Sequence, residues 1–297
     1  MPFGLSLSKP CAQYNQPFDS FRAKKYHLKI QPQWCPHKMA KPLNFAEQLV
    51  RTAQQELTAA SARNNPSTGA EKPRDVILAA CTAIGDQLAG DGFAFLKSGP
   101  SFKRRLGNFT HEIQIQSDRN NIAGQRAAIW IHASISSGQM ATWRRNNPMP
   151  WHGTDKAGLS WVIGGQIGNL LPRPDWMEWD LADDRQRQAV IDHALSTIRK
   201  IALPFFALFD QSEIAVSELL HRPALWQPFM IEYALATLGP DAAAQAMTDY
   251  LRANPIIRSR YQTALAQIKL SGPSSYRGDM ADELAAITHI YQLDPTD

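Results

Sequence analysis

Apolar and polar residues alternate with a period of two through most of the stretch from residue 93 to residue 136. This period matches the side-chain spacing on the two faces of a β-strand. Non-periodic connections separate the alternating segments, and the two-residue connection Gly107-Asn108 is typical of a hairpin turn. The pattern predicts an antiparallel meander whose strands span Phe93–Lys97, Phe102–Leu106, Phe109–Gln116 and Ala127–Ser136.

Helical spacing of apolar residues precedes this meander. One helix is predicted over residues 43–63, and a second begins after Pro73 and ends at Gly90-Asp91-Gly92. After the meander we expect a short helix over 139–145, a strand over 159–166 and an edge strand over 177–181. A long amphipathic helix then follows Asp183 and Asp184 and is expected to stop before Pro204, because proline removes a backbone donor.

The remainder of the chain is predominantly helical in pattern, with segments near 212–220, 226–238, 241–252, 256–269 and 279–291. The sequence therefore predicts an α+β fold, in which an antiparallel sheet of about five strands is packed by N-terminal helices. We expect an α+β domain over residues 43–210. Residues 211–297 form either a helical subdomain or a flank on the sheet.

Residues 1–42 mix prolines, lysines and scattered aromatics without a sustained period, so we expect a disordered or spuriously translated tail. This tail contains seven basic residues and one acid. The whole chain has 31 basic and 27 acidic residues, which leaves 24 basic and 26 acidic residues in 43–297. The expected folded part is mildly acidic, so a nucleic-acid partner is disfavoured, although the basic tail keeps that alternative open.

Several function classes lack their sequence signatures. No run of 18 apolar residues predicts a membrane span, and no signal peptide is evident, so we expect a cytoplasmic protein. Cys11, Cys35 and Cys81 suggest neither a disulfide framework nor a zinc site, and Cys81 is expected to be a buried thiol. The glycine-rich run 164–168 lacks the following helix that would hold a phosphate, so we expect a strand end or bulge and no cofactor.

Carboxylates also gather in residues 175–184, namely Asp175, Glu178, Asp180, Asp183 and Asp184. A hard divalent cation needs such oxygen ligands. However, no Glu-x-Lys or Asp-x-Lys pair follows on a strand, and Asp183 and Asp184 are explained by the start of a helix. We therefore predict no metal site.

The alternation identifies a candidate binding surface on the polar side of the meander. The odd-numbered residues of the third and fourth predicted strands, such as Ile113 and Ile131, are mostly apolar and should pack on helices. The even-numbered residues between them should then form the opposite face of the sheet. Cross-strand pairing would bring together Glu112, Gln114, Gln116, Trp130 and His132, with Ser134 beside them and Arg104 at the margin. His132 and Glu112 also have the chemistry of an acid/base pair, while an ordinary solvated sheet face explains the same residues.

A second candidate surface lies in the connections after the meander. It is rich in tryptophan and arginine, which frequently anchor protein interfaces but also cover sheet edges. The predicted anchors are Trp143, Arg144, Arg145 and Trp151, accompanied by His152, Trp176 and Trp179.

Short motifs in the meander resemble a bacterial family catalogued as domain of unknown function 4304. The resemblance covers roughly residues 75–210 and is carried by Gly92-Phe93, Phe102-Lys103-Arg104, Phe109, Ile113–Ser117, Asn120-Asn121, Ile129–Ala133 and Leu203–Phe206. These motifs are short and aromatic rather than catalytic. The resemblance implies an α+β fold and brings no activity, because the family has no established activity to carry across.

The sparse catalytic chemistry favours a non-catalytic protein that binds another macromolecule, in the context of bacterial toxin immunity or stress. One alternative is an enzyme or small-molecule receptor that uses His132 and Glu112. Another is a nucleic-acid binder that uses the basic tail together with Arg144 and Arg145. The sequence specifies neither the protein partner nor the oligomeric state.

Overall fold

The computed structural model describes residues 70–152, 155–273 and 278–295. The predicted tail over residues 1–42 and the predicted helix over 43–63 lie outside the described residues. Helix α2 (Pro73–Leu88) begins at Pro73, one residue before the predicted start, and is followed by a short 3₁₀ turn, η1 (Ala89–Asp91). Gly92 ends this turn in the left-handed conformation, with a φ of 82° that glycine adopts without strain.

The predicted meander forms the centre of an antiparallel sheet. Its strands follow the order β1 (Ala94–Leu96), β2 (Ser101–Leu106), β3 (Phe109–Ser117), β4 (Ala128–Ser137) and β5 (Trp161–Gln166). The short strand β6 (Trp179–Asp180) pairs with the first two residues of β4, while β5 pairs with its later residues. Together with the helices, this sheet confirms the predicted α+β class.

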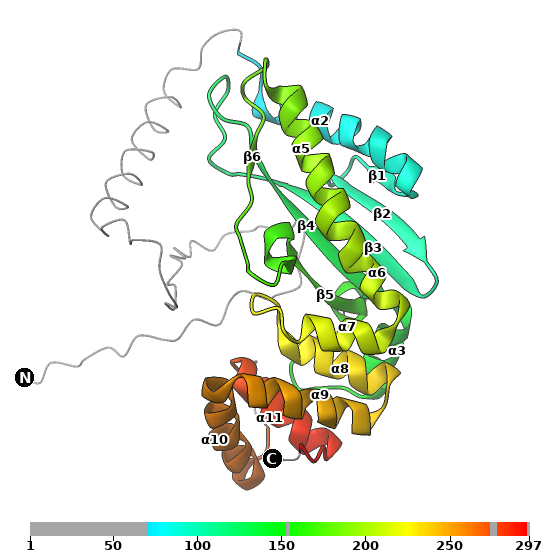
Figure 1. The fold of residues 1–297 in the computed structure, drawn as a ribbon, viewed down its shortest axis with the longest axis vertical. Helices are drawn as coiled ribbons and strands as arrows, with labels where there is room; N and C mark the ends of the chain where they lie inside the picture. The colour runs from blue at the N-terminus through cyan, green and yellow to red at the C-terminus, as the bar shows by residue number, and fades with distance from the viewer. Residues whose placement is uncertain (1–69, 153–154, 274–277, 296–297) are drawn as a thin grey trace, which may run out of the picture. The chain divides into compact units, whose positions relative to one another are not determined.

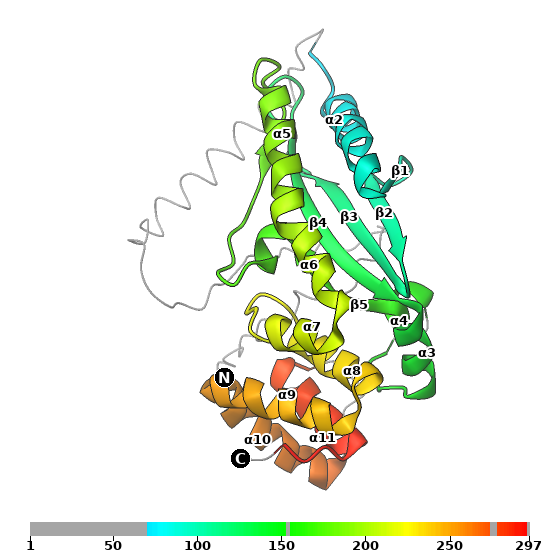
Figure 2. The same cartoon turned by 45° about the vertical axis from the view of Figure 1, so that its right-hand side comes forward.

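One face of the sheet is apolar and covered by helices. Alternate residues of β3 and β4 point into this layer, and Ile113, Ile129, Ile131 and Ile135 are fully buried there. Figures 1 and 2 show α2 and α5 (Arg187–Thr197) lying beside each other over this face. Burial of these β-branched side chains is the main driving force for the packing, at about 25 cal/mol per Å² of apolar surface.

The chain remains helical through Pro204, so the prediction that the helix stops before this residue is wrong. After α5 the backbone widens into a π-helical segment, η3 (Ile198–Ala202), and continues as α6 (Leu203–Ala207) and the 3₁₀ turn η4 (Leu208–Asp210). The Leu203 N–H donates to the Ile198 carbonyl, five residues earlier in the chain, where an α-helix would use the carbonyl four residues earlier. A local π register is one way in which a helix accommodates an irregular residue.

The helices after residue 210 agree closely with their predicted positions. They are α7 (Ser212–Leu219), α8 (Gln227–Thr237), α9 (Pro240–Ala253), α10 (Pro255–Ser271) and α11 (Met280–Tyr291), and they gather at one end of the sheet (Figures 1 and 2). Two short helices, α3 (Gly138–Asn146) and α4 (Lys156–Ser160), connect β4 to β5 at this end.

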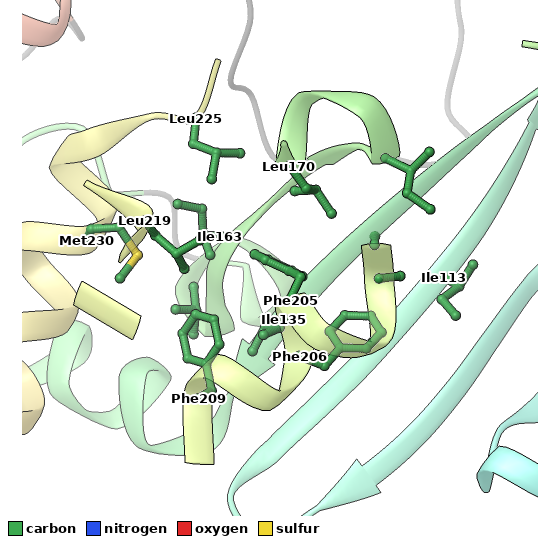
Figure 3. Packing of buried hydrophobic residues seen from close by; sticks show 14 of the residues in the cluster. Ile113, Ile135, Ile163, Leu170, Phe205, Phe206, Phe209, Leu219, Leu225 and Met230 are labelled. Atoms are coloured by element: carbon green, nitrogen blue, oxygen red, sulfur yellow. The ribbon is translucent and has the colours of Figure 1, made fainter. Parts of the chain in front are cut away.

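A single apolar core joins the sheet to these helices. Figure 3 shows Ile113 and Ile135 from the sheet, the phenylalanines of residues 205–209, and Leu219 and Met230 from α7 and α8 in one packed group. Phe209 also contacts Tyr233 of α8, with ring centroids 5.3 Å apart. The described residues all belong to one compact unit.

The glycine-rich run ends β5 and begins the 3₁₀ turn η2 (Ile167–Leu170), in agreement with the predicted strand end. At Gly164 a Cβ atom would lie 2.5 Å from the Ser134 Cβ and 2.6 Å from the Ala133 carbonyl oxygen, so β5 can approach β4 only with glycine there. Cys81 is fully buried in α2, as predicted. Within the described residues, no helix is both long and apolar enough to cross a membrane.

Candidate functional site

The side of the sheet opposite α2 and α5 carries a band of polar residues, which we call the polar face. Its cross-strand partners in β3 and β4 are Glu112 with Ser134, Gln114 with His132, and Gln116 with Trp130. These are the neighbours that strand alternation predicted. The side chains of Glu112, Gln114, Gln116, Trp130 and His132 are partly buried. The structure therefore brings together five of the six residues predicted for this face.

The sixth residue, Arg104, lies on the opposite, helix-covered side, which corrects its predicted place. Its Nε donates to His111 Nδ1 at 3.1 Å, and its Nη1 donates to the Asp91 carbonyl at 3.0 Å. The guanidinium also stacks over Phe93, 4.8 Å from the ring centroid. Arg104 thus fixes the edge of the sheet to the turn after α2.

Two basic residues that sequence reasoning missed occupy the polar face of β2. The Gly107-Asn108 turn pairs Leu106 with Phe109, which sets Arg105 opposite Thr110 and Lys103 opposite Glu112. Directly paired residues point to the same side of a sheet. Counting back from the two-residue turn would have given this register from the sequence, because loop length fixes hairpin pairing.

Glu112 and His132 do not have the environment of an acid/base pair at neutral pH. The Lys103 Nζ lies 3.0 Å from a Glu112 carboxylate oxygen, and Gln114, rather than Glu112, pairs with His132 across the strands. Burial lowers the pKa of His132 to about 4. A general base works best when its pKa lies near the operating pH, so His132 is poorly suited to this role.

A pair of tryptophans closes one end of the polar face, and we call it the tryptophan end. Trp176, from the segment before β6, meets Trp130 edge to face with ring centroids 5.3 Å apart. The Trp130 indole N–H donates to Glu178 Oε2 at 3.0 Å, and Glu178 also binds Arg126 at 2.7 Å. Trp176 itself remains 49% exposed.

The predicted second surface is divided between the core and the exterior. Trp143 and Trp151 are half-buried against the apolar core, and Trp179 is buried. Arg145 is exposed, whereas Arg144 is only 2% exposed. Arg144 is therefore not available as a surface anchor, and Trp143 and Trp151 contribute chiefly to packing.

Arg144 takes part in a buried ion network that joins α3 to α8. Its side chain lies 2.7 Å from Glu232 Oε2 and also donates to the carbonyls of residues 158, 159 and 161. His152 Nε2 lies 2.9 Å from the other Glu232 oxygen. The Met149 N–H donates to His152 Nδ1, so that nitrogen is an acceptor and the ring's proton lies on Nε2.

The electrostatics of Glu232 follow from these partners. Burial alone would raise its pKa, but Arg144 and the His152 hydrogen bond outweigh burial and lower the pKa to about 2. The carboxylate therefore stays charged at neutral pH. A buried network of this kind holds elements in place, and we assign the Arg144–Glu232–His152 network a structural role.

No family model, curated protein or solved structure matches the chain.

Three of the five carboxylates in residues 175–184 have structural partners. Glu178 binds Arg126, Asp180 Oδ1 accepts from the N–H groups of residues 127 and 182, and Asp183 accepts from the Arg185 N–H. Within the described ranges, no three side chains of the metal-ligating types lie together. The polar face and its tryptophan end are thus the better candidate for function.

Proposed function

We propose that this protein is a non-catalytic binding protein that recognises another protein through the tryptophan end of its polar face. The observation that carries the proposal is the half-exposed Trp176 held edge to face against Trp130. Tryptophan is enriched among residues that dominate binding energy, because a large ring can be buried at little conformational cost.

Contacts behind the rings support this role. Trp130 is fixed by its hydrogen bond to Glu178, and Glu178 is fixed by Arg126. Arg126 is fixed in turn by Asp118, at 2.9 Å. A surface that is ordered before binding loses less side-chain entropy on association, so the same contact area gives a higher affinity.

The charge of this region favours a protein partner over a nucleic acid. Arg126 lies within 2.9 Å of both Asp118 and Glu178, so its charge is compensated locally. Residues 43–297 together carry 24 basic and 26 acidic residues. Nucleic-acid binding needs an uncompensated basic patch for counterion release. The nucleic-acid alternative through the tail falls outside the described residues.

The biological setting remains a prediction. Membership of family 4304, a bacterial cytoplasmic setting and a role in toxin immunity or stress belong to this proposal, and the binding experiment does not depend on them.

The experiment compares proteins captured from a lysate by the wild-type chain and by two variants. Trp176→Ala removes the exposed ring. Ile256→Ala is the matched control, because Ile256 is 72% exposed on α10. We expect at least one stoichiometric partner that is reduced at least tenfold with Trp176→Ala and unchanged with Ile256→Ala, measured by quantitative mass spectrometry and then by titration with the purified partner.

The proposal fails if the capture profiles of the two variants are identical to that of the wild type. Sedimentation analysis of the same proteins tests whether the partner is a second copy of this chain. A dimer that dissociates with Trp176→Ala and persists with Ile256→Ala would identify self-association as the function of the tryptophan end.

A further inference from the structure

A cavity of about 300 Å³ lies at the other end of the polar face, where the sheet meets α3 and α4. Cross-strand pairing aligns Arg105 with Thr110, and Thr110 with Ser136, so these three side chains form a row across β2, β3 and β4. Arg145 contributes from α3. The remaining lining residues are Ser137, Gly138, Ala141, Leu159 and Ser160.

The polar groups of this cavity have unused hydrogen-bond capacity. Arg105 is exposed and has no hydrogen-bond or ion-pair partner among the described residues. Arg145 donates from Nε to the Ala141 carbonyl and from Nη2 to Thr142 Oγ1, which leaves three of its five N–H groups. In the described part of the chain, the hydroxyls of Thr110 and Ser136 also make no hydrogen bond to other residues.

The charges point to an anion. Two guanidinium groups line the cavity, and none of its lining residues is acidic. Two positive charges without a counter-ion repel each other, and an anion bound between them adds two attractive interactions that outweigh this repulsion. Gly138 begins α3, so the positive end of this helix adds to the same field. Guanidinium forks match the oxygens of phosphate with paired hydrogen bonds.

We propose that this cavity binds a phosphate group, either as the free ion or as part of a small phosphorylated molecule. Its volume lies at the lower end of the range for small-molecule pockets, so a phosphate with a compact substituent fits the space. Arg105 and Arg145 hold the charge, while the hydroxyls of Thr110 and Ser136 donate to the remaining oxygens. This site is independent of the tryptophan end, and either proposal can fail without the other.

Isothermal titration calorimetry of the full chain at low ionic strength tests the site, with inorganic phosphate and glycerol phosphate as probes and acetate as a planar anion. Arg105→Gln and Arg145→Gln each remove one lining charge. Arg185→Gln is the control, because Arg185 is exposed and lies outside the cavity, and its replacement changes the net charge of the protein by the same amount. We expect each cavity variant to weaken phosphate binding at least tenfold and the control to leave it unchanged.

The probes separate the two sources of phosphate. Tighter binding of glycerol phosphate than of phosphate assigns the site to phosphorylated molecules, and equal binding assigns it to the free ion. The proposal is overturned if neither phosphate compound binds saturably, if acetate binds as tightly, or if Arg185→Gln weakens binding as much as Arg105→Gln. Because the Arg105 side chain is exposed and makes no hydrogen bond or ion pair with a described residue, its variant should fold normally, and a wild-type melting temperature verifies this.

Discussion

Replacement of Glu232 by glutamine should destabilise the protein strongly, whereas the same change at Glu112 should have little effect. Both carboxylates pair with a cation at similar distances, 2.7 Å to Arg144 and 3.0 Å to Lys103. Burial separates them, since the Arg144–Glu232 side chains are 2% and 1% exposed and the Lys103–Glu112 side chains are 40% and 28% exposed. Glu232→Gln leaves Arg144 charged, buried and without its counter-ion.

The expected cost can be obtained in two ways. Breaking a buried ion pair by removing one partner costs about 3–5 kcal/mol, whereas an exposed pair contributes about 0–1 kcal/mol. Independently, the pKa of Glu232 falls from 4.5 to about 2, and at about 1.4 kcal/mol per pKa unit this corresponds to about 3 kcal/mol. The two values agree on the order of magnitude.

Urea unfolding followed by far-UV circular dichroism measures both variants at pH 7. Because the folded pKa of Glu232 is depressed, its stabilising contribution is fully present above pH 4.5 and is lost as the pH falls toward about 2. The gap between wild type and Glu232→Gln should therefore narrow below pH 4.5. Equal losses of unfolding free energy for Glu232→Gln and Glu112→Gln at pH 7 would refute the reasoning.

Two further predictions concern the sheet. Gly164→Ala should lower the free energy of unfolding by about 1–3 kcal/mol, because the added Cβ would overlap β4. In the control Gly90→Ala, the added Cβ meets nothing within 4 Å, so no such loss is expected. Urea titration of both variants measures the difference. Burial lowers the pKa of His132 to about 4, and burial together with the charge of Arg104 lowers the pKa of His111 to about 4. The free energy of unfolding should therefore fall as the pH drops from 6.5 to 4, because the unfolded chain binds these protons at a higher pH than the folded chain does. Thermal melts across this range and NMR titration of the two rings check the trend, and ring pKa values near 6.5 would contradict it.

Local pattern was sufficient to predict most of the fold. The alternation in residues 109–116 and 127–136 gave the two central strands and the correct face for each side chain, because the period of a strand is fixed by backbone geometry. The helices after residue 210 followed from their helical pattern. Pro204 misled the prediction, since a proline can remain in a helix when the preceding turn widens.

The candidate site was harder to predict because its contacts are not local. Arg104 and Arg105 are adjacent in β2 and therefore point to opposite faces of the sheet. The length of the Gly107-Asn108 turn sets which of them lies on the polar face, and the sequence prediction did not use it. Arg144 pairs with Glu232, which is 88 residues away, so no local pattern indicates that this arginine is buried. The contact between Trp130 and Trp176 likewise depends on the segment before β6 returning to the sheet.

The tight connection between β2 and β3 also has a consequence for the order of folding. Hairpin contacts across Gly107-Asn108 close short loops, so the loss of chain entropy is small and the β2–β3–β4 meander should form early. Docking of α8 on α3 closes a much longer loop and should follow the rate-limiting step. Changes in the meander should then slow folding, whereas changes at Glu232 should mainly accelerate unfolding and so shorten the lifetime of the native state.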